Sequence, residues 1–188
     1  MSDDVRQLVD RCLGGDQSAM VELVEMYQGP VFGLCYRMLR HRQDAEDVTQ
    51  ECFVRALRRL DTWDNQRALL PWLLAIAGNR CRTLLAARMR RPLTTSLVEQ
   101  LSDDAFDQHQ ARNLAEEVEL ALSTLRTEYR EAFLLFYQHE LSYAQIGATL
   151  DCPLGTVKTW VHRARRELIV QLRERGVVQE LRHAVRRV

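Results

Sequence analysis

Apolar side chains recur along this chain at intervals of three and four residues, which is the period of an amphipathic helix. Between residues 5 and 89 the pattern is nearly continuous and predicts four helices, at about 16–27, 29–39, 44–60 and 69–89. Asp16 is expected to cap the first of these, and Gly29-Pro30 to start the second. Pro71 falls in the first turn of the fourth helix, where a missing N–H costs little.

A second helical pattern runs from about residue 112 to residue 172 and contains the segment LSYAQIGATLDCPLGTVKTWVHRARREL, Leu141 to Leu168. This segment predicts a short helix, a tight turn and a longer basic helix. Pro153 ends the first helix, because it lacks a backbone donor and biases the residue before it away from helix. Thr156 is then able to cap the longer helix.

The longer helix separates apolar from polar side chains. The apolar stripe holds Val157, Val161, Ala164 and Leu168, and the polar side holds Lys158, Thr159, His162, Arg163 and Arg166. A recognition helix that reads DNA needs this division, with one side packed on its scaffold and the other facing base edges and phosphates. An ordinary helical hairpin with a solvated basic side is the alternative.

The helix predicted at residues 44–60, within DAEDVTQECFVRALRRL, also has two different sides. Its buried side is expected to hold Ala45, Val48, Cys52, Ala56 and Leu60, and its outer side Asp47, Glu51, Val54 and Arg58, with Gln50 beside them. An apolar Val54 within an acidic and polar stripe favours a surface that contacts another protein. An exposed helix with one stray valine is the alternative.

Downstream of this helix, tryptophan, asparagine and arginine alternate. Trp63 and Trp72 flank a polar loop with Asp64, Asn65, Gln66 and Arg67, and Asn79, Arg80 and Arg82 follow. Aromatic rings that stack on bases, together with guanidinium groups that follow the backbone, suit single-stranded nucleic acid. Tryptophans at such positions are more often anchors of a core or loop, so both interpretations of Trp63 and Trp72 stay open.

The net charge of zero conceals a segregation of charge along the chain. Five arginines and no acid lie between residues 80 and 92, and nine Lys/Arg against three Glu lie between residues 155 and 188. Residues 93–131 carry three Arg against nine Asp/Glu. Two basic segments around an acidic one indicate two places where phosphates are bound. The acidic part could fold over them or bind another partner.

Composition narrows the class of protein. A hydrophobic content of 46%, with 8 glycines and 4 prolines, favours an all-helical chain over a β architecture. No apolar run approaches the roughly 20 residues of a membrane span, and the acidic start Met1-Ser2-Asp3-Asp4 is unlike a signal peptide. We therefore expect a cytoplasmic protein without membrane insertion.

Five cysteines are scattered singly along the chain, at Cys12, Cys35, Cys52, Cys81 and Cys152. An odd number without close pairs argues against a disulfide framework and against a zinc site. They are expected to be small buried hydrophobic side chains, and no cofactor or metal is predicted.

Three motifs occur in order over residues 8–172: DAEDVTQECFVRAL, LLPWLLAIAGNRCR, and the helix-turn-helix segment. Together they resemble a bacterial RNA polymerase sigma factor of the extracytoplasmic-function (ECF, group 4) class of the sigma-70 family. The resemblance implies an all-α fold of two small helical domains joined by a flexible linker. It places sigma region 2 at residues 1–91, the linker at 92–111, sigma region 4 at 112–175 and a basic C-terminal tail at 176–188.

The resemblance also implies a promoter-specific initiation factor and assigns roles to the residues above. Region 2 would bind the clamp coiled coil of polymerase β′ through Asp44, Asp47, Gln50, Glu51, Val54 and Arg58. It would capture a base flipped from the −10 element through Trp63, Asn65, Arg67, Asn79, Arg80 and Arg82. Region 4 would read the −35 duplex through Thr156, Lys158, Thr159, His162, Arg163, Arg165 and Arg166. The β flap of the polymerase and an anti-sigma factor between the two domains are the further partners implied.

The chain departs from the family pattern at three places. Phe136-Tyr137 stand where many members carry a basic residue, which puts an upstream phosphate contact in doubt. Glu140 stands where the family often has glycine, and Lys158 replaces a more usual arginine without its bidentate fork. The promoter sequence therefore cannot be copied from relatives.

Three other functions remain to be weighed. A helix-turn-helix regulator that binds DNA without joining polymerase would explain residues 141–168 but neither of the other two motifs. A polymerase-binding adaptor that does not read DNA would tolerate the loss of Lys158 and Arg163. An enzyme is not expected, because the sequence has no Gly-rich phosphate loop, no His/Cys pair at metal spacing and no nucleophile motif.

Overall fold

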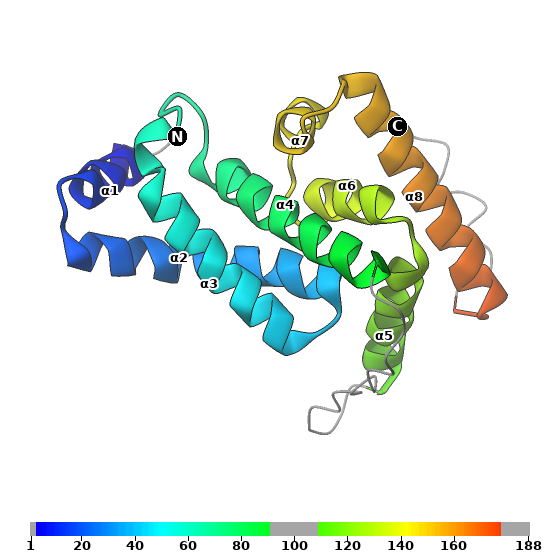
Figure 1. Ribbon diagram of the computed structural model, residues 1–188. Helices are drawn as coiled ribbons and strands as arrows, with labels where there is room; N and C mark the ends of the chain where they lie inside the picture. The colour runs from blue at the N-terminus through cyan, green and yellow to red at the C-terminus, as the bar shows by residue number, and fades with distance from the viewer. Residues whose placement is uncertain (1–2, 91–108, 178–188) are drawn as a thin grey trace.

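The computed structural model describes residues 3–90 and 109–177, and all regular structure in these two ranges is helical. The helices are α1 (Asp3–Leu13), α2 (Gln17–Leu39), α3 (Arg42–Arg58), the single-turn 3-10 helix η1 (Leu60–Thr62), α4 (Leu69–Arg90), α5 (His109–Thr124), α6 (Thr127–Tyr137), α7 (Tyr143–Leu150) and α8 (Leu154–Glu174). The predicted all-α class is confirmed (Figure 1). None of these helices is long and apolar enough to cross a lipid bilayer.

The first half of the molecule, α1 to α4, is built around α2. The long helix α2 packs against both α3 and α4, and α1 folds back on its start (Figure 1). Asp16 caps α2 as predicted, since its carboxylate accepts hydrogen bonds from the backbone N–H groups of Ser18 and Ala19.

The predicted break at Gly29-Pro30 is wrong, because α2 runs through both residues without interruption. Proline removes one helical hydrogen bond, here to the carbonyl of Met26, four residues earlier. Met26 lies on a half-exposed side of the helix, where water can take the place of the missing donor. Leu23 and Val31, on either side of the break, are fully buried and hold the two turns in one line.

The second half, α5 to α8, contains the predicted helix-turn-helix. Helix α7 opens with a capping box in which Ser142 and Gln145 satisfy each other's backbone N–H groups. It ends at Asp151, whose φ of 51° is left-handed, and the chain turns so tightly that a Cβ on Gly147 would lie 3.0 Å from the carbonyl oxygen of Cys152. Glu140 stands where related chains often have glycine, and its φ of 52° lies in the left-handed region that favours glycine.

The cap predicted at Thr156 is wrong. Helix α8 begins at Leu154, after Pro153, whose carbonyl accepts hydrogen bonds from the N–H groups of Thr156 and Val157. Thr156 therefore lies inside the first turn. Pro153, with an extended backbone, takes the N-cap position and provides no side-chain hydrogen bond to the first turn.

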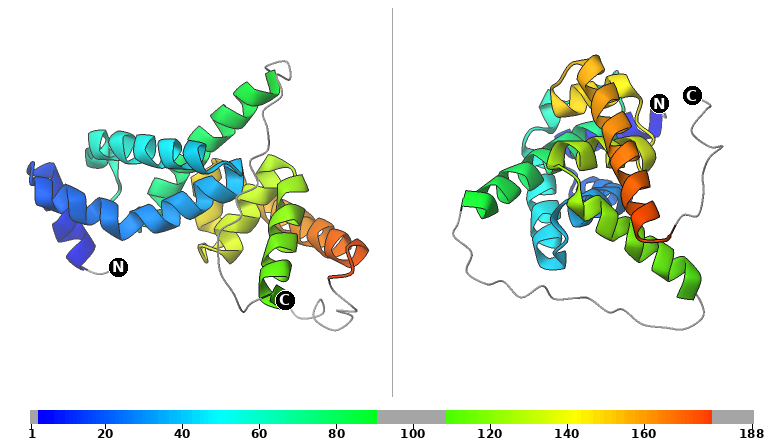
Figure 2. Two further views of the ribbon diagram at one scale, coloured as in Figure 1. Left: turned by 90° about the horizontal axis from the view of Figure 1, so that it is seen from below. Right: turned by 90° about the vertical axis from the view of Figure 1, so that its right-hand side faces the viewer.

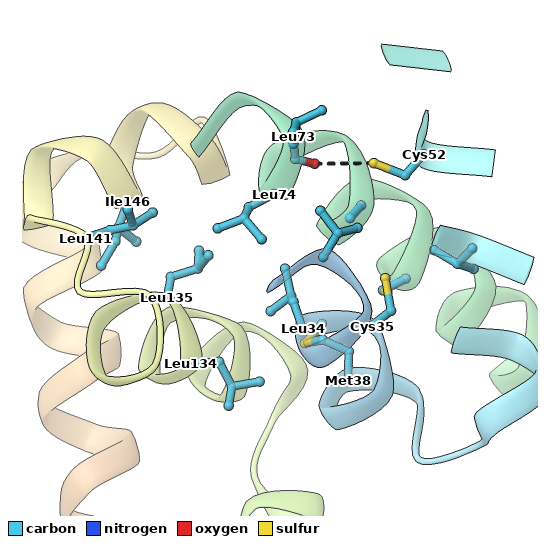
Figure 3. Packing of buried hydrophobic residues seen from close by; sticks show 14 of the residues in the cluster. Leu34, Cys35, Met38, Cys52, Leu73, Leu74, Leu134, Leu135, Leu141 and Ile146 are labelled. Carbon is cyan, nitrogen blue, oxygen red and sulfur yellow. Dashed lines mark hydrogen bonds between the residues drawn. The ribbon is translucent and has the colours of Figure 1, made fainter. Parts of the chain in front are cut away.

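The two halves pack directly against each other and share one hydrophobic core. Helix α4 contacts α7, and α2 contacts α5 and α6 (Figures 1 and 2). At the centre, Leu34 and Met38 of α2 and Leu74 of α4 lie beside Leu135 of α6, with Ile146 of α7 behind (Figure 3). All five side chains are fully buried. Residues 92–108 of the predicted linker and residues 178–188 of the predicted tail lie outside the described part of the chain.

Candidate nucleic-acid interface

The polar side of α8 faces solvent. Lys158, Thr159, His162, Arg163 and Arg166 are exposed and Arg165 is partly buried. The apolar stripe predicted for this helix is buried against α5, α6 and α7. Its members are Val157, Val161, Ala164 and Leu168. The division of the helix into a packed side and a basic open side is therefore confirmed.

Arg163 is held in place by the scaffold. Its Nη1 donates a hydrogen bond of 2.9 Å to the hydroxyl of Tyr129 in α6, while the rest of the side chain stays exposed. Thr159 is also oriented, because its hydroxyl donates to the carbonyl of Gly155 at 2.8 Å. These contacts limit the conformations of two candidate base- or phosphate-contacting residues before any ligand arrives, which lowers the entropy cost of binding.

The loop between η1 and α4 presents part of the predicted −10 set. Asn65 and Arg67 are exposed, and Arg67 forms an ion pair with Asp64 at 3.1 Å. Trp63 is only 7% exposed and belongs to the core. Its ring cannot stack on an incoming base in this arrangement, which favours the alternative of a core anchor. Trp72 is half-buried and lines a cavity instead.

That cavity, of about 680 Å³, lies between the two halves. One wall is formed by the loop, with Trp63 and Arg67, and by the start of α4, with Trp72; the other is α7, with Gln145 and Ala148. The loop predicted to capture a base therefore faces the first helix of the helix-turn-helix, a juxtaposition that the sequence did not predict.

The polar residues of α4 have partners within the protein. Asn79 is exposed, and its side-chain oxygen accepts a hydrogen bond from Arg82. Arg82 also forms an ion pair with Glu131 of α6, at 2.5 Å between Nη1 and Oε1. Arg82, which was predicted to bind the −10 strand, is thus joined to the other half of the molecule.

Arg80 and Glu51 were predicted for different ligands, yet they bind each other. The guanidinium of Arg80 donates to one carboxylate oxygen of Glu51 at 2.8 and 2.6 Å, and Arg55 donates to the other oxygen. Partial burial opposes ionisation, but the two guanidinium groups outweigh it and hold the pKa of Glu51 below its usual value. Glu51 is therefore a bridge between α3 and α4.

The rest of the outer side of α3 remains open. Asp47, Gln50, Val54 and Arg58 are exposed, and Val54 keeps 48% of its surface in water. Asp44 is partly buried, since it pairs with Arg88 at the end of α4. The apolar residues predicted for the inner side of this helix are all buried, four of them in α3 and the fifth, Leu60, in η1. A contact surface with one apolar centre is thus available for a protein partner.

Sequence reasoning missed the most deeply buried charge of the described residues. Glu131 is 1% exposed, and burial raises the pKa of its carboxyl group while Arg82 opposes that shift. The signal was present in the motif EAFLLF, where Glu131 lies at helical spacing from the buried Leu134 and Leu135. Its partner Arg82 lies 49 residues earlier, in α4, and could not be inferred from spacing.

The cysteines take the structural role that the sequence predicted. Cys12, Cys35, Cys52 and Cys81 are buried, and Cys152 is partly buried. Burial raises the pKa of the Cys52 thiol to about 12, so this thiol stays protonated. The thiol of Cys52 donates a weak hydrogen bond to the carbonyl of Leu73 at 3.5 Å (Figure 3). Among the described residues, no group of His, Cys, Asp and Glu has an arrangement that would hold a metal ion.

Two family models match the chain. Sigma-70 region 2 matches residues 23–91, and Sigma-70, region 4 matches residues 115–168. The matched residues include α3 and α4 in the first case and the helix-turn-helix in the second.

Curated relatives match over most of their length. The chain is 32% identical over 184 residues to the ECF RNA polymerase sigma factor SigW of Bacillus subtilis, covering 90% of this chain and 97% of the relative. It is 36% identical over 171 residues to the ECF RNA polymerase sigma-E factor of Escherichia coli, covering 84% of this chain and 88% of the relative.

Solved structures are similar in fold. CnrH in complex with the cytosolic domain of CnrY superimposes with a TM-score of 0.69 at 27% identity, covering 90% of this chain and 97% of that chain. The sigma factor RpoE of Bartonella quintana, in complex with the anti-sigma factor NepR, gives a TM-score of 0.65 at 21% identity. It covers 81% of this chain and 95% of that chain, and at this identity it supports the fold alone.

Proposed function

The chain belongs to the ECF class of sigma-70 factors, non-catalytic subunits that direct transcription initiation with RNA polymerase, and from this premise we propose which of its surfaces perform each step. Helix α8 reads the −35 duplex, the loop at residues 61–68 and α4 bind the single-stranded −10 element, and the outer side of α3 binds core polymerase. The exposed basic side of α8 on a fully packed apolar stripe is the observation that carries the proposal.

The reading of the duplex follows from the side chains on α8. Lys158 and Arg163 supply positive charge, which attracts the phosphates and makes binding dependent on salt concentration. His162, one turn after Lys158 and next to Arg163 in the sequence, offers a ring nitrogen to a base edge in the major groove. Arg163 approaches DNA already oriented by Tyr129, so it is the best placed of these residues for a bidentate contact.

The core-binding step is assigned to α3. An interface needs an apolar contact that excludes water, surrounded by polar groups that set specificity. Val54 provides the apolar contact, and Asp47, Gln50 and Arg58 provide the polar surroundings. A partner surface with an apolar pocket, with a basic group opposite Asp47 and an acidic group opposite Arg58, would complement this side of α3.

We assign the protein to the cytoplasm, where it meets core polymerase and the chromosome, and we propose that an anti-sigma factor controls it. The support is the similarity to CnrH, a 27% identical protein solved in complex with the cytosolic domain of CnrY. The contact surface between the halves, with its cavity of about 680 Å³, is a place where a partner could hold both halves at once.

The assignment is tested by transcription in vitro with purified core polymerase and genomic DNA of the host. Wild-type protein is expected to give transcripts that share upstream −35 and −10 motifs. Lys158→Ala and Asn79→Ala should reduce them at least tenfold, whereas Arg173→Ala, which removes an exposed charge from the last turn of α8, should not. Transcripts that survive both substitutions would refute the DNA-reading assignment.

The polymerase contact needs its own control. Val54→Arg places a charge at the apolar centre of the outer side of α3 and is expected to abolish co-elution with core polymerase. Val21→Arg makes the same change at an exposed valine of α2 and should leave co-elution intact. If Val54→Arg still co-elutes with core polymerase, the assignment of this contact to α3 is wrong. If the wild type does not co-elute with core while the free chain binds DNA strongly, a polymerase-independent regulator is the better description.

A further inference from the structure

The side of α4 around Gly78 receives a carboxylate from the other half of the molecule. Glu131 of α6 lies so close to Gly78 that a Cβ there would be 2.1 Å from Oε1 of its carboxylate. The same oxygen is 2.5 Å from the guanidinium of Arg82, one turn further along α4. Arg82 in turn donates to Asn79. Glycine at position 78 is thus what allows this buried ion pair to form across the two halves.

The Glu131 carboxylate meets the conditions of a bound anion. It is 1% exposed, so it has left water, and Arg82 supplies its compensating positive charge. The guanidinium keeps 29% of its side-chain surface exposed, which leaves it reachable from solvent if the carboxylate withdraws. A guanidinium fork that binds a carboxylate also fits a phosphate, because both present two oxygens at similar spacing.

We propose that Gly78, Asn79 and Arg82 form an anion site with two alternative occupants: the Glu131 carboxylate in the free chain, and a backbone phosphate of single-stranded promoter DNA in the complex. Glu131 then acts as an internal competitor that keeps the −10 surface from binding nucleic acid before polymerase opens the molecule. This inference rests on the proposed role of α4 in reading the −10 element.

The spacing of promoter elements requires the site to open. Elements centred near −35 and −10 lie about 25 base pairs apart, which is roughly 80 Å of B-DNA at 3.4 Å per base pair. Here α4 contacts α7, and the loop before α4 shares one cavity with α7. Halves that touch cannot span that distance, so the contact between α4 and α6 must break when both elements are read.

Two other sets of polar contacts across the interface involve residues outside the predicted DNA-binding set. Glu119 of α5 pairs with Arg37 and Arg40 of α2 at 2.7 and 3.0 Å, and Arg130 donates to the carbonyl of Met38. These contacts hold the halves together, as does the shared apolar core (Figure 3). Glu131 is distinguished from them because it binds a residue of the proposed −10 surface.

Two variants weaken the competitor from opposite sides of the interface. Glu131→Gln removes the charge and keeps the shape, whereas Gly78→Ala leaves both charged groups in place and fills the space of the carboxylate. Alanine is also a better helix former than glycine, so α4 is not expected to unfold. Glu128→Gln removes a carboxylate from the same helix, one that is 45% exposed and pairs only loosely with Arg126, and serves as the matched control.

The readout is the affinity of the full chain, without polymerase, for a fluorescent single-stranded DNA of mixed sequence and about 12 nucleotides. Both variants are expected to bind about tenfold more tightly than wild type, and Glu128→Gln about as wild type. Adding Arg82→Ala to Gly78→Ala should abolish the gain. If Glu131→Gln gains no more than Glu128→Gln, and Gly78→Ala gains nothing, the proposal is wrong.

Small-angle scattering and transcription separate this inference from the proposed function. Scattering that shows a larger radius of gyration for both variants, without tighter DNA binding, would contradict the competition while leaving the sigma function intact. If the wild type gives no promoter-dependent transcripts, but Glu131→Gln and Gly78→Ala bind single-stranded DNA more tightly as expected, the −10 assignment is refuted. The anion site then remains.

Discussion

The two surfaces proposed to read DNA differ in how much of them is free. The basic side of α8 projects into solvent, and its best anchored member, Arg163, uses one hydrogen bond to Tyr129 of its own half. On α4, by contrast, Arg80 is bound by Glu51 and Arg82 is bound by Glu131 from the opposite half. One surface is ready for a ligand, and the other must first give up its internal partners. If the proposed assignments hold, we expect duplex reading to precede strand capture.

The largest effect is expected from a substitution that weakens the contact between the second half, α5 to α8, and the first half, α1 to α4. Arg130 is 8% exposed and donates to the carbonyls of Leu122, Ser123 and Leu125, and to that of Met38 across the interface. Arg130→Ala leaves these buried carbonyls without a donor, and we expect the free energy of unfolding to fall by about 3 kcal/mol.

Urea denaturation followed by circular dichroism measures this loss. Arg126→Ala is the control, since the Arg126 side chain is 69% exposed, stacks over the ring of Tyr129 and pairs loosely with Glu128 at 3.9 Å. It should cost about 0.5 kcal/mol or less. Equal costs for the two substitutions would mean that Arg130 does not tie the halves together.

A second test uses pH at the same interface. His139 follows α6, and burial, helped by the positive charge of Arg37, lowers the pKa of its imidazole from 6.5 to about 4. Its Nε2 has no hydrogen-bond partner among the described residues. As the pH falls from 6.5 towards 4, the unfolded chain binds a proton that the folded chain does not, so stability declines. The loss attributable to His139 is about 1 to 3 kcal/mol.

His139→Gln removes this titration and should be less sensitive to acid over that interval. The experiment compares urea midpoints of both proteins at pH 7 and at pH 4.5, so that carboxylates titrating in the same range cancel. Equal shifts of the urea midpoint between pH 7 and pH 4.5 in wild type and variant would show that the neutral histidine contributes nothing to the stability of the closed arrangement.

A third test sharpens the comparison at the open surface. In the free chain, Lys158→Ala should weaken binding to a promoter duplex recovered from the transcription experiment about tenfold, which corresponds to about 1.4 kcal/mol. The slope of log affinity against log salt concentration should also fall by about one in magnitude, because one phosphate contact is lost. Arg82→Ala should leave duplex affinity within about twofold, because Arg82 is already engaged. Equal losses would place both residues on one continuous DNA-binding surface.

The smallest expected effect concerns the stability of α7, the first helix of the helix-turn-helix. Ser142 accepts a hydrogen bond from the N–H of Gln145 and is half of the capping box of α7. Ser142→Ala should lower the free energy of unfolding by about 1 kcal/mol, and Ser142→Asp, which restores a capping oxygen, should recover most of it. Failure of Ser142→Asp to recover stability would mean that the cost does not arise from capping.

What could be predicted from the sequence depended on whether the interaction was local. The amphipathic division of α8 and the cap at Asp16 follow from neighbours within one or two turns, and both predictions were right. The break predicted at Gly29-Pro30 was wrong, because packing of Leu23 and Val31 overrides the preference of proline. The family and its two regions were recognisable from three motifs in order.

The candidate site was less predictable, since its partners come from distant parts of the chain. The residues of α3, α4 and α8 could be named from the motifs, but the pairing of Glu51 with Arg80 joins positions 29 residues apart. The pairing of Arg82 with Glu131 joins positions 49 residues apart. For Trp63 the sequence left open both stacking on a base and the more frequent role of a core anchor, and only burial distinguishes the two.

The central claim is that the two halves that carry the reading surfaces touch in the free chain and separate on the promoter. The most direct measurement is the distance between probes at Ala68 and Ala148, which line the same cavity from opposite halves. The probes are introduced as non-natural amino acids because the chain has 5 cysteines of its own. A short distance in the free chain that grows by tens of ångströms with core polymerase and promoter, as the roughly 80 Å between the elements requires, would support the account. The same distance in both states would contradict it.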